Sequence, residues 1–345
     1  MPNTPPNTPP DDRSTPPNAE PALTPPGRDE QTVFGVKAAL ALLTHRPADV
    51  RRIYHAPALR AELGPHLSAA AARHLPYREL EPDALARVAE SAHHEGLVVV
   101  AAALRYRALT AALARSAGPA ALWLVLDRVE NPHNLGALVR TAAFFGLSGV
   151  LAGGVAPGDK VNTAVLRVSE GGAEWVPLFA APALPDALRA LREAGCRVLG
   201  LETDGSLRLA DALADGLTAG PLAVVLGQER DGLSTAARSA CDALCVLEGG
   251  GPLASLNVSV AAAVALAQVL HGRARPRPLP AAAPEPGAPA RHESREPRQQ
   301  RRPGGRPSRP PRLAAGSARP SEPPTPPGPA RPPRTGRRIR PGKPR

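Results

Sequence analysis

Residues 122–146 read LWLVLDRVENPHNLGALVRTAAFFG, an apolar run followed by a polar turn and a longer, mostly apolar segment. The run LWLVL, bounded by Asp127, is typical of a buried β-strand over residues 122–127. Pro132 fixes a turn, and Asn134 can cap a helix that we expect over residues 134–145. The stretch therefore predicts a strand–turn–helix unit.

The same alternation of strand and helix continues to residue 271. It predicts an α/β domain over residues 120–272, with a parallel sheet covered by helices on both faces. Ligands of such sheets bind at the carboxyl ends of the strands. Here those ends carry the polar segments DRVENPHN, LETDG, GQERDG and LEGGGPLASLN. We expect further strands at 149–154, 175–179, 196–203, 222–227 and 245–249, and further helices at 159–169, 185–194, 235–240 and 257–271.

A smaller α/β unit precedes this domain, over residues 32–105. Apolar and β-branched clusters predict strands at 50–56 and 97–103. Helical patterns precede and separate them, at 36–45, after Pro57 and at 82–90. Residues 106–119 are expected to form a linker with a short helix.

The two ends of the chain differ from the middle in composition. Most of the 44 Pro lie in residues 1–31 and 273–345, which lack apolar periodicity, so we expect both ends to be disordered. The C-terminal end carries 19 Lys and Arg against 4 Glu, so with a chain total of +11 the remainder carries −4. A basic arm of this kind favours RNA by counterion release, although a solubility tail explains it equally well.

Several function classes are disfavoured by what the sequence lacks. The three cysteines form no CxxC pair and have no His at metal-ligand spacing, which argues against zinc and against a disulfide scaffold. No secretory signal and no apolar stretch of membrane-spanning length is present, so we expect a cytoplasmic protein without a membrane anchor. Neither GxGxxG nor a GxxxxGK[ST] phosphate loop occurs in the expected context.

Three segments carry polar residues that packing alone does not demand. In the first, Arg140 follows Asn134 by under two helical turns, so both can face one site. A plain helix cap for Asn134 and a solvated face for Arg140 are the alternatives. In the second, LGQERDGLS, Glu229 sits between two glycines after an apolar strand, and an ordinary turn capped by Ser234 is the alternative. The third, GGGPLASLNVSV, gathers Ser255, Asn257 and Ser259 at one helix start, more groups than a cap needs.

These segments, NPHNLGALVRTAAFFG, LGQERDGLS and PLASLNVSVAAAVAL, resemble in this order motifs 1, 2 and 3 of the SpoU/TrmH family of RNA ribose 2′-O-methyltransferases. The resemblance covers about residues 122–271. VFGVKAALALL and HHEGLVVVA, at either end of the first unit, resemble the small ribosomal-protein-like substrate-binding domain that many members carry.

The resemblance implies a trefoil-knotted methyltransferase domain, an S-adenosyl-L-methionine (SAM) cofactor and a homodimer formed through the knot, with the active site near the interface. RNA, either rRNA or tRNA, is the implied substrate, and no metal is implied. The implied cofactor pocket is formed by strand ends and the glycine-rich loop, with Leu201, Thr203, Leu226, Gly227, Leu247, Leu256 and Asn257.

Arg140 is the residue to which the resemblance assigns activation of the ribose 2′-hydroxyl. A guanidinium is a poor base on its own, so two versions stay open: a perturbed Arg140 that takes the proton, or a charged one that orients the hydroxyl and stabilises the alkoxide. Asn134 would position Arg140 or the ribose. Glu229 and Ser255 would complete the polar wall and orient Arg140, and Asn257 belongs to the same catalytic set.

Three alternatives remain at this point. A knotted methyltransferase could act on a base, although the set of Asn134, Arg140 and the SLN segment argues against it. A non-catalytic RNA-binding or assembly factor would have no need of Arg140, Glu229 and Asn257. A resistance-type enzyme acting on one rRNA site would share the chemistry.

Overall fold

The computed structural model describes residues 25–273, so the disorder predicted for residues 1–31 and 273–345 falls almost entirely outside the described chain. The first α/β unit begins two residues earlier than expected, because the first strand starts at Glu30. It is a four-stranded sheet in the order β1-β4-β2-β3, in which β4 is antiparallel to both neighbours and β3 is parallel to β2. Its main elements are β1 (Glu30–Phe34), α1 (Val36–His45), β2 (Val50–His55), α2 (Gly64–Ala72), β3 (Tyr77–Glu79), α3 (Pro82–Ala89) and β4 (Leu97–Ala102).

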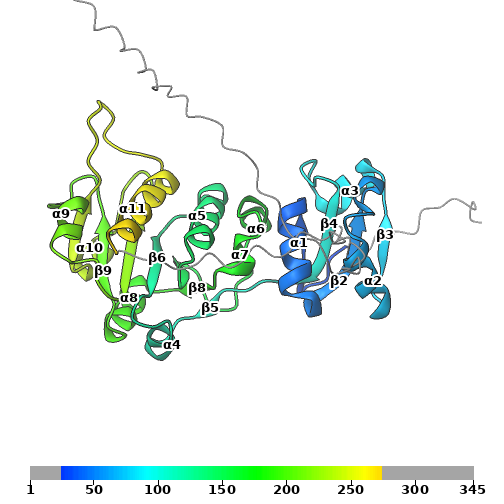
Figure 1. Cartoon of the computed structure of the whole chain (residues 1–345), viewed down its shortest axis with the longest axis horizontal. Coiled ribbons are helices and arrows are strands. Elements are labelled where there is room, and N and C mark those ends of the chain that lie inside the picture. Colours follow the sequence, from blue (N-terminus) through cyan, green and yellow to red (C-terminus); the bar gives the residue numbers. More distant parts are fainter. Residues whose placement is uncertain (1–24, 274–345) are drawn as a thin grey trace, which may run out of the picture. The chain divides into compact units, whose positions relative to one another are not determined.

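The second domain is an eight-stranded, all-parallel sheet in the order β10-β12-β9-β11-β6-β7-β8-β5. Figure 1 shows its helices alternating with strands along the chain. The strands are β5 (Arg107–Ala108), β6 (Leu122–Asp127), β7 (Gly149–Gly153), β8 (Leu178–Ala181), β9 (Arg197–Leu201), β10 (Leu207–Arg208), β11 (Leu222–Gly227) and β12 (Ala243–Val246). The helices are α4 (Ala111–Ser116), α5 (Pro132–Phe145), α6 (Thr163–Val168), α7 (Gly172–Trp175), α8 (Leu184–Glu193), α9 (Leu209–Ala214), α10 (Thr235–Ala240) and α11 (Val258–Gly272).

The two faces of this sheet are each covered by helices, as the sequence predicts. Alternate side chains of β6 enter different cores: Leu124 packs in the cluster that includes α5, α6 and α11, whereas Trp123 and Val125 pack with α8 and α10. Strands buried on both faces explain why LWLVL and LAVVL are continuous apolar runs rather than alternating ones.

Three local expectations need correction. The helix expected from residue 159 begins at Thr163, because the backbone of Asp159 and Val161 is hydrogen-bonded to the segment at Leu104–Tyr106 instead. The strand expected at 175–179 begins at Leu178, since Trp175 ends the short helix α7. The expected linker at 106–119 contains β5, which pairs with β8 at the edge of the large sheet, and α4, which packs on α8.

Candidate active site

The motif segments meet because their strands are neighbours. β12, β9, β11 and β6 lie side by side and run parallel, so the segments that follow them leave the same edge of the sheet. The register aligns Leu226 with both Leu201 of β9 and Leu126 of β6. This edge therefore gathers residues that lie up to 130 positions apart in the sequence.

Asn134 is the centre of a polar network that joins all three motifs. Its side-chain amide donates to the carboxylate of Glu229, and its oxygen accepts from Nδ2 of Asn257 at 3.1 Å. The Asn257 oxygen in turn accepts from the backbone N–H of Ser259 at 2.9 Å and from its hydroxyl at 2.6 Å. Asn134, Glu229 and Asn257, one residue from each motif, thus meet at one point.

The helix cap expected at Asn134 belongs to another residue. Asn131 caps α5 by accepting from the N–H of His133 at 2.9 Å, and Pro132 occupies the first turn. Asn134 is therefore the third residue of the helix, where its side chain contacts Glu229 and Asn257. Asn257, by contrast, combines both roles, since it also caps α11.

The motif 2 turn folds back tightly on the end of β11. The N–H of Gly232 donates to the carbonyl of Gln228 at 3.1 Å. A Cβ on Gly227 would lie well under 3.0 Å from the backbone of Gly232 and Leu233. Only glycine therefore permits this turn to close, and the turn sets the position of Glu229.

Two carboxylates and an arginine that the sequence analysis did not assign hold the same turn. Asp127 is buried and accepts from the N–H of Ser234 at 2.6 Å, while Glu202 accepts from the N–H of Leu233 at 2.6 Å. Arg128 donates to the carbonyl of Gly232 at 3.3 Å. The signal was present in the sequence, because Asp127 and Glu202 each follow an apolar strand, but which backbone group they bind depends on the register of three strands.

The residues expected to form the cofactor pocket lie around the ends of β9, β11 and β12. Leu201, Leu226 and Gly227 are buried in the strands, Thr203 is exposed and Leu247 is half-buried. The loop 249–257 is exposed along its whole length, with Leu253 84% and Leu256 54% exposed. Uncovered leucines beside glycine-lined backbone fit a purine cofactor, since apolar side chains can cover the ring and main-chain groups can bind its edge.

Within the single chain, Arg140 is not part of the Glu229–Asn134–Asn257 network. Six residues along α5 from Asn134, it is displaced by about 9 Å and rotated by about 120° around the axis. Its side chain is 55% exposed, and Nη1 forms an ion pair with Oε1 of Glu170 at 2.9 Å. The sequence expected Glu229 and Ser255 to flank Arg140, but Glu229 contacts Asn134 and Ser255 lies in the exposed loop.

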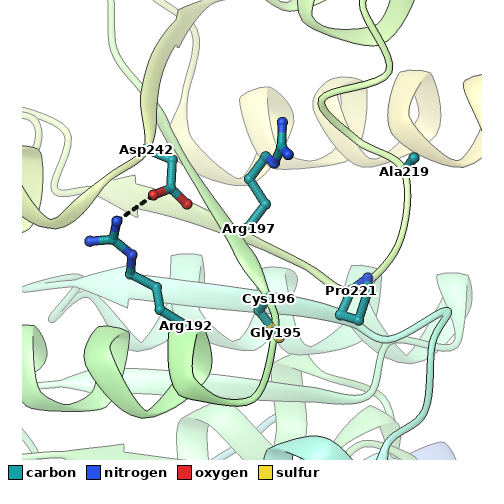
Figure 2. A pocket seen from close by; sticks show the side chains of 7 residues that line it. All are labelled: Arg192, Gly195, Cys196, Arg197, Ala219, Pro221 and Asp242. Carbon is teal, nitrogen blue, oxygen red and sulfur yellow. Dashed lines mark ion pairs between the residues drawn. The ribbon is translucent and has the colours of Figure 1, made fainter.

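A pocket of about 440 Å³ lies at the opposite edge of the sheet (Figure 2). Arg197 begins β9 and Pro221 precedes β11, so this pocket is at the amino ends of the strands and is distinct from the cofactor edge. Arg192 forms an ion pair with Asp242 at 2.7 Å across its rim. Burial raises the pKa of the Cys196 thiol in its wall, so that group is not a nucleophile at neutral pH.

Among residues 25–273, no group of His, Cys, Asp or Glu is arranged to hold a metal ion. Nor does any helix in that range have the length and apolar character needed to cross a membrane.

Comparison with known proteins identifies the family. Residues 121–267 match the SpoU rRNA methylase family, and residues 32–107 match the family described as RNA 2′-O ribose methyltransferase substrate binding. The chain is 33% identical over 255 residues to the 23S rRNA (guanosine-2′-O-)-methyltransferase RlmB of Shewanella oneidensis, covering 71% of this chain and 99% of that protein. The chain belongs to the SpoU methylase family.

Other similar proteins agree with this assignment. A protein of Mycolicibacterium vanbaalenii named an uncharacterized tRNA/rRNA methyltransferase is 38% identical over 192 residues, 55% of this chain and 59% of that protein, so the match spans less than two thirds of it. The AdoMet complexes of an rRNA methyltransferase from Sinorhizobium meliloti and of AviRb from Streptomyces viridochromogenes share the fold. Their TM-scores are 0.58 and 0.56 at 21% and 24% identity, over 70% and 71% of this chain and 87% and 91% of theirs.

Membership confirms the enzyme class, the SAM cofactor and the α/β architecture with a separate substrate-binding domain that the motifs predicted. This SpoU methylase transfers a methyl group to a ribose 2′-hydroxyl of RNA.

Proposed function

We propose that this SpoU methylase modifies a guanosine 2′-hydroxyl in 23S ribosomal RNA, using Arg140 against the ribose and the ends of β9, β11 and β12 for the cofactor. The observation that carries the proposal is the network Glu229–Asn134–Asn257, which joins the three motifs at one point. The similarity to the Shewanella oneidensis enzyme over nearly its whole length supports ribosomal RNA as the substrate.

The residues of the proposed site have different roles according to their positions. Leu201, Leu226 and Gly227 end the strands on which the cofactor would rest, and the loop carrying Leu247 and Leu256 would cover it. Thr203 and Ser255 supply hydroxyl groups at the exposed rim. Asn134, fixed from both sides by Glu229 and Asn257, presents a rigid polar surface to the ribose.

The protein has to place the ribose 2′-oxygen near the methyl group and to stabilise the negative charge that develops on that oxygen. When bound, SAM supplies a methyl group on a positively charged sulfur, which keeps the bonding electron pair when the methyl leaves. The ribose 2′-oxygen forms the new bond to that carbon, and its proton goes to water at the exposed rim. The guanidinium of Arg140 donates to the oxygen as negative charge develops on it. The proposal therefore gives Arg140 the orienting role rather than the basic one.

A homodimer through α5 and α11 is part of the proposal. These two helices pack together and leave Phe144 82%, Val260 47% and Val264 38% exposed. Exposed apolar side chains on two helices that pack together favour a protein interface there. Phe144 follows Arg140 by one helical turn, so a second copy on this face would bring Arg140 to the subunit boundary. The trefoil knot and a cytoplasmic location also stay proposals, supported by the family resemblance.

The proposal is tested with the purified full chain, labelled SAM and 23S rRNA, followed by nuclease digestion and mass spectrometry. The expected product is 2′-O-methylguanosine, and Arg140→Ala should abolish it while calorimetry still detects SAM binding. A methylated base would instead identify a base methyltransferase. SAM binding with no turnover on ribosomal or transfer RNA would favour an assembly factor. Full activity of Arg140→Ala would remove that residue from the mechanism.

A further inference from the structure

The ion pair of Arg140 involves a residue outside the three motifs. Glu170 lies between α6 and α7, and each of its carboxylate oxygens meets a different cation: Oε1 meets Arg140 at 2.9 Å and Oε2 meets Lys37 at 2.7 Å. Both cations have mostly exposed side chains, whereas that of Glu170 is 34% exposed. We propose that Glu170 is a positioning residue that holds the Arg140 guanidinium toward the ribose, an inference that rests on the proposed function.

The backbone fixes the carboxylate beside α5. Gly172 follows two residues after Glu170, and a Cβ there would lie 3.1 Å from the Cα of Arg140 and 3.2 Å from the carbonyl oxygen of Val139. Gly171 is similarly close to α1, where a Cβ would lie 2.6 Å from that of Ala41. The turn is thus packed directly on the helix that carries Arg140, and the carboxylate cannot move away with the loop.

Glu170 itself has φ of 47°, in the left-handed region that side chains other than glycine disfavour. The preceding and following packing imposes this conformation, and strained residues of this kind cluster at functional sites. A glycine at position 170 would adopt the same backbone more easily. A turn with a purely structural role would not require a carboxylate at position 170.

The charge of Glu170 is secured by its neighbours. The hydrogen bond from Lys37 and the positive charges of Arg140 and Lys37 lower the pKa of Glu170 below its ordinary value, which favours the ionised carboxylate. An ionised carboxylate can bind both cations at once, whereas a glutamine has one acceptor oxygen and a donor amide that would face a cation.

The expected effect is on the chemical step rather than on binding. An exposed arginine samples many rotamers, and a misplacement of about 1 Å at a reacting group costs about a hundredfold in rate. Loss of Glu170 should therefore lower kcat and leave the KM for RNA and the affinity for SAM nearly unchanged.

The test compares Glu170→Gly and Glu170→Gln in the full chain with 23S rRNA. We expect kcat to fall about tenfold to a hundredfold in both, with the Tm of Glu170→Gly equal to or above that of the wild type, because glycine relieves the backbone. The kcat of Glu170→Gly would then fall while its Tm does not, a combination that a merely structural role does not produce. Asp186→Asn, which removes a carboxylate from an exposed Asp–Arg pair on α8, is the matched control and should leave kcat unchanged.

A double-mutant cycle with Arg140→Lys completes the design. If Glu170 acts through Arg140, Glu170→Gln should lower the residual kcat of Arg140→Lys by less than twofold. Additive losses, an unchanged kcat in Glu170→Gly, or a raised KM with normal kcat would each overturn the positioning role. A wild type that methylates while Glu170→Gly keeps its kcat defeats this inference alone, whereas a wild type that does not methylate defeats the proposed function.

Discussion

An alanine at position 227 should disrupt the motif 2 turn, because the added carbon has no room. The Cβ would lie well under 3.0 Å from the carbonyl group of Gly232 and the amide nitrogen of Leu233, and all of these are backbone atoms that cannot rotate aside. The turn cannot easily retreat either, since Asp127 and Glu202 hold the N–H groups of Ser234 and Leu233 at 2.6 Å each. Either the carboxylate bonds or the end of β11 must give way.

The cost follows from these contacts. Overpacking a close-packed site costs about 1–3 kcal/mol, and a clash with doubly held backbone belongs at the upper end, about 3 kcal/mol. At about 2–4 °C per kcal/mol for a chain of this size, the Tm should fall by about 6–12 °C. Because Gly227 also lines the proposed cofactor wall, SAM affinity should fall more than tenfold, about 1.4 kcal/mol.

Thermal melting followed by differential scanning calorimetry and SAM titration by isothermal calorimetry measure the two effects. Gly64→Ala is the matched control, since a Cβ at Gly64 meets no atom within 4 Å and the backbone there does not have positive φ. Its Tm should equal or exceed that of the wild type. If Gly227→Ala kept both the wild-type Tm and the wild-type SAM affinity, the tight fold-back of the motif 2 turn would be refuted.

Two further predictions concern the surface and the thiols. Replacing Phe144 by Ser should shift the chain from dimer to monomer in sedimentation velocity while the melting temperature changes little, because this side chain is 82% exposed in the single chain; an unchanged dimer would exclude this face as the interface. Iodoacetamide at pH 8 should label the native protein slowly and the urea-unfolded protein completely, with labelling read by mass spectrometry. The reason is that burial raises the pKa of all three thiols, that of Cys241 to about 12. Rapid labelling of Cys196, Cys241 and Cys245 in the native protein would contradict this.

The strands of the sheet could be predicted from the sequence because a strand buried on both faces is a continuous run of apolar residues. LWLVLD and LAVVLG are continuous apolar runs, and β6 and β11 occupy those residues. Thr235–Ala240 likewise forms α10, and Ser234 caps it, as the alternative interpretation of the motif 2 turn had it. Short elements such as β5 and α7 were missed, since two to four residues carry no periodicity.

Residues of the candidate site could be named from the sequence, but the contacts between their side chains could not. Asn134, Glu229 and Asn257 could be named because polar side chains at strand ends and helix starts stand out from apolar surroundings. The partner of Arg140 could not, because Glu170 is 30 residues away and reaches it only through a glycine turn packed on α5. Such contacts depend on how helices pack, which local patterns do not encode.

The separation of Asn134 and Arg140 around α5 has a consequence for how the reaction is organised. One side of the helix is bound into the network with Glu229 and Asn257. The other side packs on the turn before α7, from which Glu170 reaches Arg140. A ribose that touches both sides would lie across α5, where Arg140, Lys37 and Glu170 line a pocket of about 310 Å³. A cofactor edge fixed by the motif network and an arginine placed by an ion pair thus divide the proposed reaction between two sides of one helix.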